Sequence, residues 1–161
     1  MTIWFTSDTH FGHTNIIRYC NRPFQDTHEM NKTIVENWNA CVQDNDTVWH
    51  LGDVTFGNPT ILHRLKGIIH LCLGNHDKEK FLQKTGRFAS MTREPVISKG
   101  SHPSVLFHYP MESWPGQSHK AIHLHGHSHG KMRKAPNRFD VGVDCFGFKP
   151  VTLEEILAVA N

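Results

Sequence analysis

Apolar residues recur along the chain at two spacings, one typical of strands and one typical of helices. Short apolar runs rich in β-forming residues predict strands at residues 2–8, 46–53 and 68–77. The clearest helical spacing, that of Met30, Ile34 and Trp38, predicts a helix over residues 27–42. Shorter helical segments are expected at 13–20 (a helix or a turn), 58–66 and 78–85. The first half of the chain therefore alternates strands with helices.

The second half of the chain has a different pattern, in which hairpins dominate. Residues 96–110 predict a hairpin that turns at Lys99 and Gly100. Two further strands are expected at residues 120–130 and 138–144. Because helical crossovers imply parallel pairing and hairpins imply antiparallel pairing, we expect sheets of mixed type.

The chain ends with a predicted helix over residues 152–160. Thr152 is expected to cap it, and Glu155 occupies the third helical position of a capping box. Together these elements predict an α/β layered domain in which sheets are covered by helices. A chain of 161 residues suits one such domain, so we expect residues 1–161 to form a single unit.

Composition narrows the class of protein. The longest apolar runs fall well short of 18 residues, which argues against a membrane span. The net charge of +2 is too small to indicate a broad nucleic-acid surface. Four cysteines are spread along the chain without a CxxC pair, which favours free thiols and a cytoplasmic protein.

Residues that bind metals gather at the ends of the predicted strands. In chain order they are Asp8, His10, Asp53, Asn75, His76, Asp77, His108, His127 and His129. The carboxyl ends of strands in open α/β sheets are where sites form. Since residues i and i+2 of an extended chain point the same way, we expect Asp8 and His10 to reach one ion together. A sharp bend at Gly126 would then direct His127 and His129 to the same place.

Each of these residues also has an ordinary structural interpretation. Asp8 and Asp53 are typical turn-capping residues, and a lone histidine such as His108 is more often a hydrogen-bonded core residue. The stretch "HLHGHSHG", residues 123–130, is also compatible with loose metal storage. His123 and His125 within it are expected to be structural or close to the site. The ordered set is therefore more informative than any single member.

The blocks "DTH", "GD", "GNHD", a lone His108 and "GHSH" occur in this order between Asp8 and His129. They resemble the calcineurin-like metallophosphoesterase family, and the closing segment "FDVGVDCFGFKPVTLEEI" is similar to that of its small bacterial and phage members. The resemblance implies an α/β fold, a four-layer α-β-β-α sandwich of two mixed sheets with flanking helices.

The same resemblance implies a site for two divalent metal ions. One ion would be held by Asp8, His10, Asp53 and His129. The other would be held by Asp53, Asn75, His108 and His127, so that Asp53 bridges the two. Carboxylate, amide and imidazole donors without thiolate suit Mn, Fe, Zn, Ni or Co and argue against a structural zinc. We expect Mn.

The implied reaction is hydrolysis of phosphodiester bonds, and of phosphomonoesters as well, by a hydroxide that the two ions share. The expected substrates are small-molecule phosphoesters or nucleotides, with nucleic acid as a further candidate. His76 would stabilise the transition state or protonate the leaving group, and Asp77 would orient it. The alternative is an interaction module with the same fold and weak catalysis.

One block departs from the family pattern. Members that act on phosphoproteins often carry "GDxVDRG", whereas this chain has "GDVTFG", with Phe56 in place of the second acid. This departure disfavours a phosphoprotein phosphatase and favours a simpler, more open phosphodiesterase or a nonspecific phosphatase. Arg22 and His13 are the candidates for contact with the phosphate in this chain. The basic loop Lys131 to Lys134 is either solvated or a lip that faces the substrate.

Overall fold

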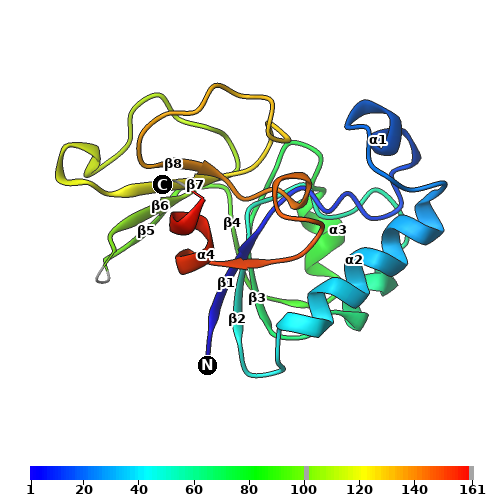
Figure 1. Cartoon of the computed structure of the whole chain (residues 1–161). Helices are drawn as coiled ribbons and strands as arrows, with labels where there is room; N and C mark the ends of the chain where they lie inside the picture. Colours follow the sequence, from blue (N-terminus) through cyan, green and yellow to red (C-terminus); the bar gives the residue numbers. More distant parts are fainter. Residues whose placement is uncertain (100–101, 160–161) are drawn as a thin grey trace.

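Two mixed sheets form the framework of the computed structural model, which describes residues 1–99 and 102–159. The first sheet has the order β4-β3-β2-β1-β9 and the second the order β5-β6-β7-β8 (Figure 1). The strands of the first are β1 (Ile3–Thr6), β2 (Thr47–His50), β3 (Ile68–Cys72), β4 (Phe88–Thr92) and β9 (Val151–Thr152). Those of the second are β5 (Val96–Ser98), β6 (Ser104–Leu106), β7 (Ile122–His125) and β8 (Arg138–Asp140).

The pairing directions place the functional edge. Strands β1 to β4 are parallel neighbours in the first sheet, and β9 joins β1 antiparallel. In the second sheet, β6, β7 and β8 are parallel, and β5 pairs antiparallel with β6. The carboxyl ends of β1, β2 and β3 consequently lie at one edge, where the loops carrying the predicted ligands begin.

Helices cover the outer face of the first sheet (Figure 1). The longest, α2 (Thr27–Cys41), begins at Asp26, whose carboxylate accepts a hydrogen bond from the backbone N–H of Glu29 at 2.8 Å. Its buried residues Met30, Ile34 and Trp38 pack against the sheet, as their spacing predicts. The other covering elements are α1 (Thr14–Tyr19), the 3₁₀ helix η1 (Pro59–Arg64) and α3 (Glu79–Gln83). Within the described ranges, every helix is too short or too polar to cross a bilayer.

A second apolar cluster fills the space between the sheets. Phe5 and Leu51, on the side of the first sheet, pack in the same cluster as Leu106 and Leu124 of the second sheet. The short helix α4 (Leu153–Ala158) adds the buried Ile156 to this cluster. The outer face of the second sheet is covered by the segment 109–121, which includes the 3₁₀ helix η2 (Gln117–His119). The prediction of two mixed sheets flanked by helices is confirmed. The layer outside the second sheet is thin, because it consists of one irregular segment with a short 3₁₀ helix.

Several local predictions need adjustment. Residues 58–66 form a 3₁₀ helix rather than an α-helix, and the strand expected at 138–144 ends at Asp140, before the 3₁₀ helix η3 (Val143–Cys145). Strand β4 was not predicted, because at the sheet edge its residues are exposed or half-buried and lack apolar alternation. The hairpin β5–β6 is confirmed, although its Gly100 lies outside the described residues. The capping box of Thr152 and Glu155 forms, whereas Ala160 lies outside the described part.

We expect Trp38→Ala to lower the free energy of unfolding by about 3–5 kcal/mol, because it leaves a cavity under α2. Trp38 is fully buried, and its indole N–H donates to the carbonyl of Lys66 at 3.0 Å. The exposed Glu36 on the same helix provides the control, and Glu36→Ala should change stability by less than about 0.5 kcal/mol. Urea unfolding of both variants measures the difference. Equal effects would contradict the placement of α2.

Candidate metal centre

The loops that follow β1 and β2 run side by side beyond the edge of the sheet. The backbone N–H of Asp8 donates to the carbonyl of Gly52 at 2.9 Å, and that of His10 donates to the carbonyl of Asp53 at 3.0 Å. These bonds continue the pairing of β1 with β2 past the regular strands. They therefore bring the Asp8 and Asp53 carboxylates into one small region.

Asp8 and His10 do not lie on extended chain, so the expectation that they point the same way because of strand alternation is wrong. Both have left-handed backbones, with φ of 57° and 49°, and so do Asp53 (56°), His127 (68°) and His129 (48°). Such conformations cost of order 1–3 kcal/mol each for residues with a side chain and cluster at functional sites. The side chains converge because the left-handed turns redirect them.

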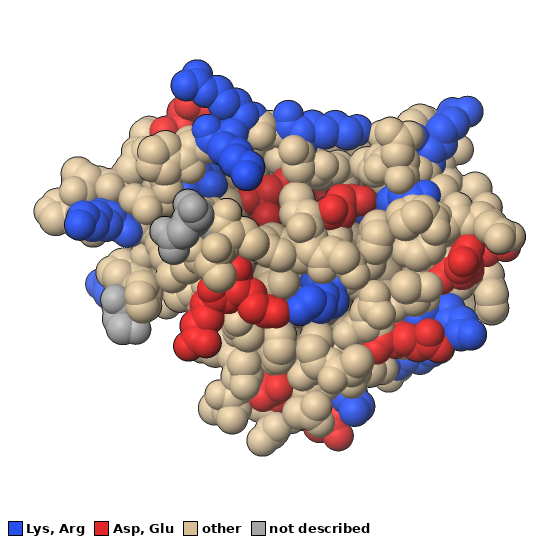
Figure 2. Space-filling model, in the orientation of Figure 1, with Lys and Arg blue, Asp and Glu red and all other residues tan. Residues whose placement is uncertain are grey.

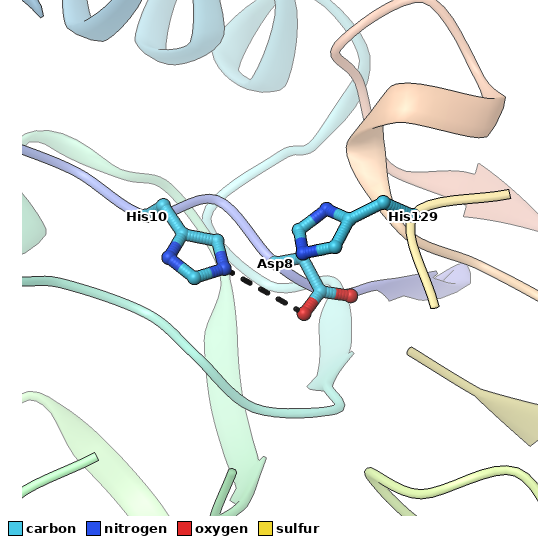
Figure 3. A group of neighbouring side chains, drawn as sticks. All are labelled: Asp8, His10 and His129. Carbon is cyan, nitrogen blue, oxygen red and sulfur yellow. Dashed lines mark ion pairs between the residues drawn. The ribbon is translucent and has the colours of Figure 1, made fainter. Parts of the chain in front are cut away.

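Three of these residues form the first group of metal-binding side chains, Asp8, His10 and His129 (Figure 3). The Oδ1 of Asp8 lies 3.8 Å from the Nε2 of His10. Both atoms are buried and have no hydrogen-bond partner among the described residues. An unpaired buried polar atom costs about 1–3 kcal/mol, so two that face each other fit a cation between them.

The second group consists of Asp53, His108 and His127, with Asn75 beside them. The Nε2 of His108 lies 3.6 Å from the Oδ2 of Asp53 and 3.0 Å from the Oδ1 of Asn75. The Nδ1 of His127 lies 3.0 Å from the same amide oxygen. The other ring nitrogen of His108 lies 2.7 Å from the carbonyl of Leu51, which fixes that nitrogen as the donor. Its Nε2 lone pair then faces the site.

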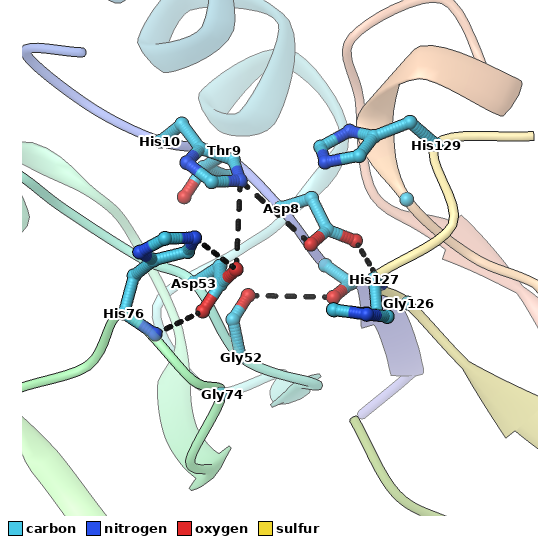
Figure 4. Close-up of polar contacts among 12 residues, drawn as sticks. Asp8, Thr9, His10, Gly52, Asp53, Gly74, His76, Gly126, His127 and His129 are labelled. Atoms are coloured by element: carbon cyan, nitrogen blue, oxygen red, sulfur yellow. Dashed lines mark hydrogen bonds and ion pairs between the residues drawn. The ribbon is translucent and has the colours of Figure 1, made fainter. Parts of the chain in front are cut away.

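Asp53 connects the two groups (Figure 4). Its Oδ2 is 3.7 Å from the Nε2 of His10 and 3.6 Å from the Nε2 of His108. The structure thus brings all seven predicted metal ligands together around one carboxylate. Asp53 is thus the one residue whose carboxylate lies beside an imidazole of both groups, among the described residues.

Burial sets the protonation of the first group. The pKa of Asp8 is raised well above its ordinary value, first by burial and then by the charges of Asp140 and Asp53. The pKa of His10 is lowered far below its ordinary value, mainly by burial and next by the nearby Arg22. His10 is therefore a neutral imidazole, the form that binds metals.

His76 stands at the open side of the centre and belongs to neither group. Its backbone N–H donates to the Oδ1 of Asp53 at 2.9 Å, and its ring Nε2 lies 4.0 Å from the Oδ2 of Asp53. The side chain is about half exposed, with a relative accessibility of 46%. The ring therefore reaches the surface beside the bridging carboxylate, where a substrate would approach.

Asp77 does not orient His76, which corrects the expectation from sequence. Its buried carboxylate accepts three backbone hydrogen bonds, from Asp53 at 2.8 Å, Val54 at 2.9 Å and Gly74 at 2.9 Å. These bonds tie the loop after β2 to the loop after β3. Asp77 thus holds the backbone of the bridging residue in place.

Arg22 is buried beneath the site and does not face it, so its expected contact with phosphate is ruled out. Its guanidinium makes a two-point ion pair with Asp144, with both N–O distances at 2.8 Å, and donates to the carbonyl of Asp8 at 2.7 Å. Asp144 in turn lies 2.8 Å from the Nδ1 of His129. This chain of contacts fixes the ring of His129 so that its Nε2 is free for the first group.

Asp140 and Asp144 are the functional residues that sequence reasoning missed. The carboxylate of Asp140 accepts from the Ser128 hydroxyl at 2.7 Å and from the Gly130 N–H at 2.8 Å, which holds the loop carrying His127 and His129. The apolar pattern of the segment "RFDVGVD" predicts a strand and assigns no role to its acids. Its two acids, Asp140 at the end of β8 and Asp144 in η3, are the sequence feature that would have indicated a role near the metal ligands.

Gly126 and Gly74 lie so close to neighbouring residues that there is no room for a side chain at either position. A Cβ at Gly126 would overlap Ser7 and Asp8, and one at Gly74 would overlap the Asp53 carboxylate. The φ of Gly126 lies outside the left-handed region, so the expected bend does not come from glycine conformation at that position. The left-handed residues on its carboxyl side, His127 and His129, make the turn instead.

The remaining histidines of the "HLHGHSHG" stretch are structural. His123 and His125 are buried, and each has a ring nitrogen about 3 Å from a backbone carbonyl, of Val105 and of Gly126 respectively. The pKa of His123 is lowered to about 4, mainly by burial. Neither side chain belongs to the two metal-binding groups.

The comparison with known families agrees with this geometry. The sequence model of the calcineurin-like phosphoesterase superfamily domain matches residues 1–139. The chain belongs to this family, whose members are phosphoesterases.

Relatives span nearly the whole chain. An uncharacterized protein of Methanocaldococcus jannaschii is 36% identical, over 96% of this chain and 89% of its own. The gene 66 protein of Mycobacterium phage L5 is 28% identical, over 98% and 93%. A crystal structure of a protein of unknown function from Aquifex aeolicus aligns with a TM-score of 0.78 at 26% identity and covers 98% of both chains. The E. coli phosphoesterase Yfce shares the fold, with a TM-score of 0.53 at 18% identity over 88% and 78%.

We expect Asp144→Asn to weaken metal binding roughly 10–100-fold, because His129 and Arg22 lose their charged partner. Asp44→Asn, at an exposed position before β2, is the matched control and should bind metal like the parent. Calorimetric titration with Mn²⁺ measures both, and thermal unfolding checks that the variants are folded. If folded Asp144→Asn protein binds Mn²⁺ as tightly as the parent, the ion pair of Asp144 with Arg22 stabilises the fold and does not contribute to metal binding.

Proposed function

We propose that this phosphoesterase holds two divalent ions and hydrolyses phosphodiester bonds in substrates of nucleotide or nucleic-acid type, and phosphomonoesters as well. The observation that carries the proposal is the position of Asp53. Its Oδ2 lies within 4 Å of an imidazole nitrogen from each of two groups of metal-binding side chains. In the first group, the buried Oδ1 of Asp8 and the buried Nε2 of His10 have no hydrogen-bond partner among the described residues.

The charge of the site favours a phosphate substrate. Two divalent ions carry four positive charges and the carboxylates of Asp8 and Asp53 return two, which leaves about +2. When bound, such ions act as Lewis acids that lower the pKa of water and polarise phosphoryl oxygens. The donor set of oxygens and imidazoles suits Mn, Fe, Zn, Ni or Co, and we propose Mn as the native metal.

In this proposal, the protein's own side chains hold the metal ligands in position and donate a proton to the leaving oxygen. Hydrolysis breaks one P–O ester bond, gives phosphorus an oxygen from water, and leaves the departing oxygen in need of a proton. The half-exposed ring of His76, beside Asp53 but outside both groups, is placed to donate that proton or to stabilise charge on the phosphoryl group. Asp77 and Asp144 keep the ligands in position through their own hydrogen bonds.

Two other interpretations are weaker. Loose metal storage by the "HLHGHSHG" stretch would need His123 and His125 to be available, and both are buried and hydrogen-bonded. An interaction module without catalysis would not require His76 or a complete donor set, and this chain has both. The free cysteines support a reducing compartment, and we propose the cytoplasm.

We expect Mn²⁺ to stimulate hydrolysis of bis(p-nitrophenyl) phosphate and EDTA to abolish it. Asp53→Asn should lower both the activity and the bound metal, because the bridging charge is lost. Metal analysis by mass spectrometry and absorbance of the released nitrophenolate measure the two effects. The proposal fails if Mn, Ni, Co and Zn all give no turnover. Metal content unaffected by Asp53→Asn would favour the storage interpretation.

We expect His76→Ala to retain its metal and to reduce kcat by a factor of about 10²–10⁴, the usual contribution of a general acid. His63→Ala, an exposed histidine on η1, is the control and should match the parent. Steady-state kinetics measure kcat, and metal analysis of the same samples measures the bound metal, so a loss of catalysis is distinguished from a loss of metal. Loss of metal in His76→Ala would assign this residue to the ligand set instead.

A further inference from the structure

A row of aromatic rings leads from the metal centre to the end of α1. We call Phe56, His13 and Tyr19 the aromatic strip. The rings of Phe56 and His13 are nearly parallel, with centroids 4.0 Å apart, and the ring of Tyr19 stands edge-on to His13 at 6.4 Å. At its inner end, Phe56 lies 4.8 Å from the ring of His76. The strip therefore begins where the substrate is expected to react.

Packing does not explain the strip. Phe56 is 44% exposed and Tyr19 is 54% exposed. Neither residue belongs to the apolar clusters found among the described residues, although Phe24 and Phe148, also near α1 and α2, do. Exposed aromatic side chains that contribute nothing to a core and adjoin a site indicate a binding surface.

Two cations accompany the rings. The guanidinium of Arg18 lies 5.5 Å from the centroid of the Tyr19 ring. The Nζ of Lys131, from the loop after β7, donates to the carbonyl of Tyr19 at 2.8 Å. Figure 2 shows Lys and Arg side chains along the upper margin of the molecule, over α1 and the loops that follow the second sheet. The basic loop is thus joined to the outer end of the strip.

We propose that the aromatic strip, with Arg18 and Lys131, binds the nucleotides that flank the scissile phosphate of a single-stranded nucleic acid. The inference rests on the proposed phosphodiesterase function and specifies its substrate. Bases have flat faces that stack on aromatic rings, and phosphates pair with cations. A row of rings with two cations at its outer end therefore matches an unpaired strand. In a duplex those faces are already stacked on neighbouring bases.

The small number of cations limits the length of the strand. A net charge of +2 leaves little long-range attraction, so the affinity must come from local stacking and about two phosphate contacts. A strand of a few nucleotides that ends at the metal centre satisfies both conditions. Short oligonucleotides are therefore the expected ligands.

The test measures fluorescence anisotropy of a labelled, phosphorothioate-linked hexathymidylate, which resists cleavage, on the Mn²⁺-loaded protein. Phe56→Leu and Tyr19→Leu should each weaken binding at least about 5-fold, because base stacking is lost while the apolar bulk is retained. Phe81→Leu, an exposed aromatic on α3, is the matched control and should bind like the parent.

Salt dependence tests the cations separately. Each of Arg18→Gln and Lys131→Gln should reduce the slope of log Kd against log salt by about 0.7, the value for one phosphate contact with a single strand. The control is Lys99→Gln. Lys99 is an exposed residue directly after β5, a strand that lies far from α1 (Figure 1), so this change should leave the slope unchanged.

The inference is overturned if the parent binds a hairpin duplex as tightly as the hexathymidylate. It is also overturned if none of the four variants of Phe56, Tyr19, Arg18 and Lys131 differs from the controls. Hydrolysis of bis(p-nitrophenyl) phosphate by the parent separates this failure from that of the proposed function. An active enzyme whose strip variants bind the oligonucleotide normally would refute only the strip. An inactive enzyme would refute the phosphodiesterase.

Discussion

Two buried carboxylates, Asp8 and Asp53, lie within 4 Å of the same imidazole nitrogen of His10, and the rest of the structure depends on this concentration of charge. Burial removes the hydration of Asp8, and the charges of Asp140 and Asp53 repel it, which is why the pKa of Asp8 is raised. A cation between Asp8 and Asp53 would remove both penalties at once. The two groups of metal-binding side chains around these carboxylates are therefore the candidate sites for divalent ions.

The fold holds this unfavourable arrangement through a second set of acids. Asp77 binds the backbone of the loop that carries Asp53, and Asp140 binds the loop that carries His127 and His129. Asp144 connects the His129 ring to the buried Arg22, which also binds the carbonyl of Asp8. The loop of Asp53 and the loop of His127 and His129 thus each have a carboxylate anchor, and the backbone of Asp8 is held by Arg22. The strained left-handed turns persist because these contacts surround them.

The sequence predicted the parts that depend on local pattern. Apolar spacing located α2 and strands β1 to β3, and parallel pairing then implied that Asp8, Asp53 and Asn75 meet at one edge. It did not predict β4, whose exposed edge position removes the apolar signal. Nor could it pair Arg22 with Asp144, because 122 residues separate them and no local periodicity links them. Backbone handedness at the ligands was likewise unreadable, since Asp and His have no fixed φ preference as proline does.

The most direct test of this account is anomalous diffraction at the manganese absorption edge from crystals soaked in Mn²⁺. The account predicts two peaks on either side of the Asp53 carboxylate. One would adjoin Asp8, His10 and His129, and the other Asn75, His108 and His127. A single peak, or peaks away from Asp53, would contradict it.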